Sequence, residues 1–247
     1  MSIEQLSIPV GSESLEVIHF SRPKAPLVLF CHGFPGIYKH LDLAEGLFRS
    51  GFGTMVMKYR GVDASTGFFD FTSAIEDMAA VVQHTPNLDI APGGIGVFGY
   101  SIGAYYALNV AVENSLISSV CALSPVSDLP GAARADFENI YQLMLDSQNL
   151  IRTRGVADLV ASFAEVWERY NLPKRIKGVH NVSLLIIEGT KGEMSYPEQA
   201  QILYDIANEP KELRWMQDAG HFFTEPEERK QLLDMIRSFF IDTLHPI

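Results

Sequence analysis

The chain alternates short runs of consecutive apolar residues with longer segments that favour helix. An apolar run without polar alternation is typical of a strand buried on both faces, as in a parallel sheet. The last helical segment carries Leu232, Ile236 and Phe240 on one stripe, which is typical of a helix packed on such a sheet. The predicted buried strands are residues 26–31, 53–59, 93–100, 117–126 and 182–189, and the predicted helices are residues 39–51, 72–84, 101–113 and 225–243.

Three further segments are predicted as edge strands. Residues 3–10 and 15–22 flank the turn sequence GSES, and residues 211–217 precede the last helix. Because strand and helix alternate through most of the chain, the pattern predicts an α/β fold with a mostly parallel central sheet and helices on both faces.

Residues 129–178 interrupt this alternation, because they lack a buried-strand pattern and favour two or more helices. A connection of about fifty residues is long for a crossover between strands, so we predict a helical cap inserted over the strand ends, and the alternative is a set of ordinary crossover helices. The expected organisation is one domain over residues 1–247 that contains this insertion. Its aromatic residues are Phe137, Tyr141, Phe163, Trp167 and Tyr170.

The chain of 247 residues has a formal net charge of −11, which disfavours nucleic acid and anionic membrane surfaces as partners. No apolar run is long enough to cross a bilayer, and the first residues lack the basic start and apolar core of a signal peptide. We therefore expect a cytoplasmic protein. Cys31 and Cys121 lie in apolar runs and are expected to be small buried side chains rather than reactive thiols.

The segment Gly99-Tyr100-Ser101-Ile102-Gly103 joins a predicted buried strand to a predicted helix. A serine at so sharp a turn is held in a strained backbone conformation that lifts its hydroxyl above the sheet edge. Glycines are needed two residues away on both sides because larger side chains would collide. The positive end of the following helix favours negative charge that develops nearby. The pattern predicts Ser101 as a nucleophile, and the alternative is a serine that only caps the helix.

A second motif, FCHGFPG at residues 30–36, follows the first buried strand. Its backbone amides can turn toward the serine, where an attacked ester or amide carbonyl becomes an oxyanion that needs two N–H donors. We assign these donors to the backbone amides of Phe34 and of Ile102, the residue after the nucleophile. His32 is expected to brace the loop rather than to act as a base, since it ends a buried strand.

A third motif, DAGHFFTEPEE at residues 218–228, lies between the last predicted strand and the last helix. This places His221 in a loop at the same sheet edge as Ser101. A neutral imidazole can take the serine proton and return it to a leaving group. We predict His221 as the general base, and the alternative is an ordinary loop histidine.

Together the motifs HGFPG, GYSIG and AGHFF resemble the α/β-hydrolases in order and spacing, specifically the esterase and acyl-peptidase-like branch with an inserted helical cap. The segment KYRGVDASTGFFDF also resembles the corresponding loop of that branch, so the resemblance covers essentially the whole chain. It implies an α/β-hydrolase fold, a Ser-His-acid triad, an acyl-enzyme intermediate, and neither a metal nor an organic cofactor.

The acid of the triad is where the sequence departs from the family. The resemblance implies an aspartate in a Gly-x-x-Asp turn after the strand that follows the cap, but that position holds Gly192. Glu193 lies one residue later and has a longer side chain. Asp128 follows the strand before the cap, where some members of the fold keep their acid. The sequence leaves open whether Glu193, Asp128 or no residue fills this role.

We therefore predict a serine hydrolase that cleaves a carboxylic ester, or a thioester or small amide, of a small-molecule substrate. Carboxylesterase activity is preferred to peptidase activity, because no extra domain selects peptides. The alternative is a catalytically weak or inactive binding protein on the same fold, since loss of the acid typically lowers turnover by about 10⁴. A lyase or acyltransferase of the same fold stays open, and the sequence makes no prediction of oligomeric state.

Overall fold

A computed structural model describes residues 2–36, 39–91, 94–191 and 197–244, with the backbone alone over 132–137. An eight-stranded sheet forms its centre, in the order β1-β2-β4-β3-β5-β6-β7-β8. The strands from β4 to β8 pair in parallel, whereas β1 and β2 are antiparallel. The strands are β1 Ser2–Val10, β2 Glu13–Ser21, β3 Leu27–Cys31, β4 Gly53–Met57, β5 Ile95–Tyr100, β6 Ile117–Leu123, β7 Ser183–Gly189 and β8 Lys211–Met216.

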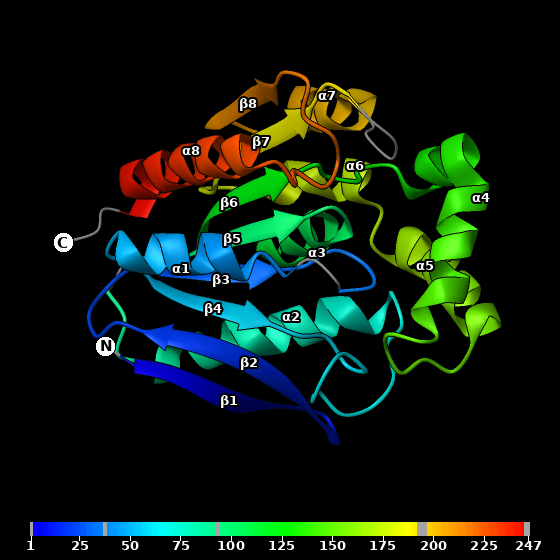
Figure 1. The fold of residues 1–247 in the computed structure, drawn as a ribbon, viewed down its shortest axis with the longest axis horizontal. Coiled ribbons are helices and arrows are strands. Elements are labelled where there is room, and N and C mark those ends of the chain that lie inside the picture. The colour runs from blue at the N-terminus through cyan, green and yellow to red at the C-terminus, as the bar shows by residue number, and fades with distance from the viewer. Residues whose placement is uncertain (1, 37–38, 92–93, 192–196, 245–247) are drawn as a thin grey trace.

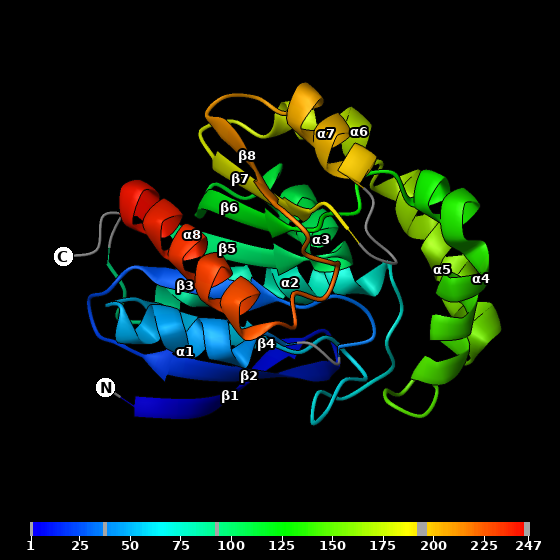
Figure 2. The ribbon, with the colours of Figure 1, turned by 45° about the horizontal axis from the view of Figure 1, so that its top comes forward.

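Helices cover both faces of the sheet (Figures 1 and 2). Every residue of β3, β4 and β5 is buried, as expected for strands with a helix layer on each side. One core lies under α1 and α8, and the other lies under α2, α3 and α7. These helices are α1 Leu41–Arg49, α2 Ser73–His84, α3 Ile102–Ala111, α7 Pro197–Ile206 and α8 Pro226–Leu244, and a short 3₁₀ turn, η1 Thr85–Asn87, follows α2.

Between β6 and β7 the chain forms the helical insertion, which we define as residues 129–178. It contains α4 Leu129–Ser147, α5 Val156–Arg169, α6 Leu172–Arg175 and the 3₁₀ turn η2 Ile176–Gly178. Both views place α4 and α5 beyond the carboxyl ends of the central strands (Figures 1 and 2). These helices stand at the sheet edge where β5 ends.

The α/β prediction is confirmed, with one correction at the amino-terminal hairpin. β1 lies at the sheet edge, but β2 lies between β1 and β4 and is not an edge strand. The correction follows from burial, because Leu15, Val17 and Phe20 of β2 are enclosed while most of β1 is exposed. None of the described helices is long and apolar enough to span a bilayer.

Candidate active site

Ser101 lies at the junction between β5 and α3, at the carboxyl edge of the sheet. Its backbone has φ 56° and ψ −124°, a conformation that L-residues rarely adopt. Its N–H donates to the Leu123 carbonyl at 2.9 Å, which ties the turn to the end of β6. The hydroxyl makes no capping hydrogen bond to α3, and the side chain is only partly buried. Helix capping therefore does not account for this serine.

The flanking glycines permit two close approaches of backbone. A Cβ on Gly99 would lie 2.6 Å from Ala104 Cα, at the start of α3. A Cβ on Gly103 would lie 2.5 Å from the Cys31 carbonyl oxygen and 2.6 Å from that of His32. Both contacts are with backbone that cannot rotate away, so α3 can begin directly above β3 and β5 only because these positions are glycine.

Gly103→Ala is expected to lower the free energy of unfolding by about 3 kcal/mol, the upper part of the range for overpacked sites. The matched control is Gly53→Ala in β4, where an added Cβ has no neighbour closer than Leu27 Cδ1 at 3.4 Å. That variant should change the free energy of unfolding by less than about 1 kcal/mol. Urea unfolding of both variants measures the difference, and equal stabilities would contradict the close approach of α3 to β3.

The loop after β3 lies directly against Ser101. A Cβ on Gly33 would lie 3.1 Å from Ser101 Cβ, so the peptide that carries the Phe34 N–H adjoins the serine. His32 is buried beneath this loop, with Nδ1 2.8 Å from the Gly33 carbonyl oxygen and its ring 4.6 Å from that of Tyr59. Burial lowers the pKa of His32 to about 4. Gly33, the residue before Phe34, therefore lies next to Ser101.

His221 lies in the loop between β8 and α8, next to Tyr100, the residue that precedes Ser101. Its ring centroid is 5.2 Å from that of Tyr100, and the Tyr100 hydroxyl donates to the His221 carbonyl at 3.2 Å. The side chain is 4% exposed, and burial lowers its pKa to about 4. Nδ1 has no hydrogen-bond partner among the described residues. The imidazole is therefore neutral at physiological pH, the form that a general base requires.

Of the two acid candidates, Glu193 lies outside the described residues, and so does Gly192. Asp128 stands immediately before α4 and is held there by Gln199 of α7. The Gln199 side chain accepts the Asp128 N–H at 2.6 Å and donates to its carbonyl oxygen at 3.1 Å. The Asp128 carboxylate lies over the first turn of α4, where a Cβ on Gly131 would come within 2.3 Å of it. No described contact joins Asp128 to His221.

The segment that leads to Glu193 runs beside the segment that leads to His221. The Lys191 N–H donates to the Ala219 carbonyl at 3.0 Å, and the Asp218 N–H donates to Thr190 Oγ1 at 3.0 Å. A Cβ on Gly189 would lie 2.4 Å from the Ala219 carbonyl oxygen. Residues 189–191 and 218–220 are therefore neighbours along their length.

One buried carboxylate at this edge was not identified in the sequence analysis. Glu188, the penultimate residue of β7, is 1% exposed and accepts hydrogen bonds from the Ser124 hydroxyl at 2.8 Å and the Gly189 N–H at 3.0 Å. It links the ends of β6 and β7. The sequence feature that could have identified Glu188 is an acidic residue in the largely apolar strand segment SLLIIEG.

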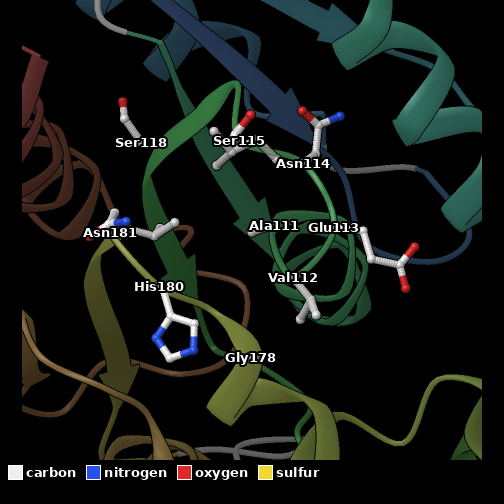
Figure 3. Close-up of a pocket in the computed structure, with 11 residues that line it drawn as sticks. Ala111, Val112, Glu113, Asn114, Ser115, Ser118, Gly178, His180 and Asn181 are labelled. Atoms are coloured by element: carbon white, nitrogen blue, oxygen red, sulfur yellow. The ribbon is translucent and has the colours of Figure 1, made fainter.

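The two cysteines are buried and free, and neither is suited to act as a nucleophile. Burial raises the pKa of the Cys31 and Cys121 thiols, which disfavours thiolate chemistry at either residue. No described group of His, Cys, Asp and Glu side chains is arranged to hold a metal ion. A surface pocket of about 430 Å³ lies at the opposite, amino ends of β6 and β7, and is lined by residues that include Glu113, Ser118 and His180 (Figure 3).

A strained serine on a sharp turn from strand to helix, at the end of a mostly parallel sheet, is the arrangement that α/β-hydrolases use. The model of the alpha/beta hydrolase family matches residues 28–234, and the chain belongs to this family. It is 26% identical over 229 residues to an uncharacterized protein of Mycobacterium tuberculosis, covering 91% of this chain and 73% of that protein. It is 24% identical over 221 residues to the uncharacterized protein YfhR of Escherichia coli K12, covering 85% and 70% respectively.

Solved structures resemble the fold over nearly its full length. Est1E from Butyrivibrio proteoclasticus with bound ferulic acid has a TM-score of 0.79 and 18% identity, covering 97% of this chain and 99% of that one. The Pyrococcus furiosus esterase PF2001 has a TM-score of 0.77 and 19% identity, covering 98% and 91%. At these identities the likeness establishes the α/β-hydrolase fold.

Proposed function

We propose that the protein is a serine hydrolase that cleaves a carboxylic ester through an acyl-enzyme intermediate on Ser101. The observation that carries the proposal is the strained backbone of Ser101, combined with a partly exposed residue whose hydroxyl takes no part in capping α3. Strain of this kind persists only where the surrounding structure imposes it, and it is concentrated at functional sites. Thioesters and small amides are related substrates of the same chemistry.

In the proposed reaction, Ser101 Oγ attacks the carbonyl carbon while its proton passes to the neutral ring of His221. The carbonyl oxygen becomes an oxyanion that accepts hydrogen bonds from the backbone amides of Phe34 and Ile102. The carbon–oxygen bond to the leaving alcohol then breaks, and His221 returns the proton to that alcohol. Water, activated by His221 in the same way, releases the acid from Ser101.

The aromatic side chains of the insertion favour an apolar acyl or aryl group in the substrate. Phe163 and Trp167 of α5 are partly buried and pack with the core beside the sheet edge. The similar Est1E structure holds ferulic acid, which is an aryl acid. We therefore expect the highest kcat/KM for esters with an apolar acyl chain or an aryl acyl group.

A fluorophosphonate probe, which reacts with activated serines, tests the proposal directly. The folded protein should be labelled, and peptide mapping should locate the adduct at Ser101. A screen of p-nitrophenyl esters of graded chain length should then rank the acyl preference. Absence of labelling and of hydrolysis would favour a second candidate, a binding protein on a hydrolase scaffold, which is suggested by the lack of a described partner for His221 Nδ1.

We propose Glu193 as the acid that orients His221. The support is that residues 189–191, which end two positions before Glu193, run beside residues 218–220, whereas Asp128 is held at the start of α4 by Gln199. Glu193→Gln should lower kcat by about two to four orders of magnitude, because an amide cannot stabilise the imidazolium. Asp128→Asn should lower it by less than about tenfold, and reversed results would assign the role to Asp128.

The pH dependence of kcat/KM gives an independent measure of the same assignment. Burial alone holds the pKa of His221 at about 4, and a carboxylate at Nδ1 raises it. The base works only when neutral, so activity falls as the pH drops through this pKa. The acid limb of the wild type should therefore lie above pH 4, and Glu193→Gln should move it down toward about 4. An acid limb that does not move would contradict Glu193 as the acid.

A further inference from the structure

Phe69 and Phe71, which we call the phenylalanine pair, lie in the loop after β4 and are each 2% exposed. Their backbone amides both donate to the helical insertion. The Phe69 N–H donates to the Arg152 carbonyl at 2.8 Å, and the Phe71 N–H donates to Ser162 Oγ at 3.2 Å. The contact is tight, because a Cβ on Gly61 would lie 2.3 Å from the Arg152 carbonyl oxygen.

The rings of the same pair both contact Phe34. The ring centroids are 5.3 Å apart for Phe34 and Phe69, and 4.9 Å apart for Phe34 and Phe71. The Phe71 ring also meets Phe163 of α5 edge-on at 5.2 Å. In each member of the pair, the backbone amide therefore donates a hydrogen bond to the insertion. The ring packs against Phe34, in the loop that adjoins Ser101.

We propose that the phenylalanine pair, held by Ser162 of the insertion, positions the Phe34 amide for oxyanion binding. This inference rests on the proposed ester hydrolysis. The Phe34 ring and that amide belong to the same residue, so the packing of the pair against the ring restrains the backbone that carries the N–H. Loss of one oxyanion donor typically costs about 10²–10³ in kcat, and a shift of about 1 Å in a positioned group can cost about 10².

Substitution of Ser162 removes a contact of the phenylalanine pair without changing a residue that contacts the reacting atoms. It is 7% exposed in α5, its hydroxyl accepts the Phe71 N–H and donates to the Leu159 carbonyl at 3.1 Å, and its carbonyl accepts the Thr72 hydroxyl at 3.3 Å. Ser162→Ala removes the acceptor of the Phe71 amide, while Ser162→Thr retains a hydroxyl there.

The chain offers a matched control for each variant. Ser147 is a fully buried serine of α4 whose hydroxyl donates to the Met144 carbonyl at 2.8 Å, so Ser147→Ala removes a buried hydroxyl that bonds within its own helix. Phe240 of α8 is fully buried in the opposite core, so Phe240→Leu reproduces the loss of a packed ring that Phe71→Leu causes. The unfolding free energies of each variant and its control are measured alongside the kinetics.

The experiment compares kcat and KM for p-nitrophenyl acetate across these variants. Phe71→Leu should lower kcat by about tenfold or more and Ser162→Ala by about fivefold, with KM within about twofold, because the lost interaction acts in the transition state. Ser162→Thr retains the hydroxyl and should therefore keep kcat close to the wild-type value. Ser147→Ala and Phe240→Leu should keep kcat within about twofold of the wild type, although Phe240→Leu loses as much stability as Phe71→Leu.

Three outcomes would overturn the inference. If Phe71→Leu and Ser162→Ala keep the wild-type kcat while Ser101 is still labelled by a fluorophosphonate, the positioning role is wrong and the proposed hydrolase stands. If KM rises and kcat does not change, the insertion contacts the substrate instead of positioning the amide. If the wild type is neither labelled nor active toward esters, the proposed function fails, and this inference fails with it.

Discussion

Ser101→Ala is expected to abolish ester hydrolysis, with a fall in kcat of at least about ten-thousandfold. The alanine variant has no oxygen to form the acyl-enzyme, and the oxyanion donors alone give only residual catalysis over water. Fluorophosphonate labelling should disappear in the same variant. Undiminished hydrolysis by folded Ser101→Ala would show that another residue is the nucleophile.

The unfolding free energies of variants at Ser101 distinguish a catalytic role of this residue from a packing role. The Ser101 hydroxyl makes no capping bond, so Ser101→Ala should change the free energy of unfolding by less than about 0.5 kcal/mol. Ser101→Gly should raise it by about 1 kcal/mol or more, because glycine adopts φ 56° without steric cost. An inactive glycine variant that is more stable than the wild type would indicate that the strain is retained for function. Urea unfolding measures both changes.

His221→Ala should be nearly as damaging as loss of the nucleophile, with a fall in kcat of about 10⁴ or more, because nucleophile and base act as one unit. Without the imidazole, no described group beside Ser101 is placed to take its proton, so the residual rate should rise with hydroxide concentration. The measurement is a pH profile of hydrolysis from about pH 5 to about pH 9. A loss of activity below about tenfold would point to another base.

His40→Gln is a matched control for the His221 variant. His40 is 5% exposed against 4% for His221, and its ring lies 4.5 Å from the same Tyr100 ring. Its Nδ1 atom accepts a hydrogen bond from Arg229 Nη1 of α8 at 3.0 Å. Replacement should lower stability while kcat stays within about tenfold of the wild type. Equal losses of kcat in both variants would indicate that the His221 effect is structural.

The amino-acid sequence by itself determined the class of fold and the position of the strained serine. Continuous apolar runs such as residues 27–31 predict buried parallel strands. A strand that is buried on both faces has apolar residues at successive positions, whereas a half-exposed strand alternates apolar and polar residues. The turn at Ser101 is likewise encoded within a few residues, in the junction of an apolar run, two spaced glycines and a helix. These features are local, so a short window of sequence contains the information that specifies them.

The surroundings of the candidate site were decided by the tertiary structure. Gly103 is needed because of backbone at Cys31 and His32, on a strand far away in the chain. Asp128 suits an acid by its place after β6, but Gln199 of α7 holds it at the start of a helix. Neither contact corresponds to a periodic pattern of residues that could be recognised in the sequence.

The same distinction applies to the loop that we propose as the source of an oxyanion donor. The motif HGFPG indicates that a backbone amide turns toward the serine, but it does not indicate what holds that amide in place. The phenylalanine pair, the insertion residue Ser162 and the Phe34 ring come from three separate segments that meet only in the folded chain. Local propensity specifies elements, whereas contacts between distant segments depend on how those elements pack, and packing is a property of the whole fold.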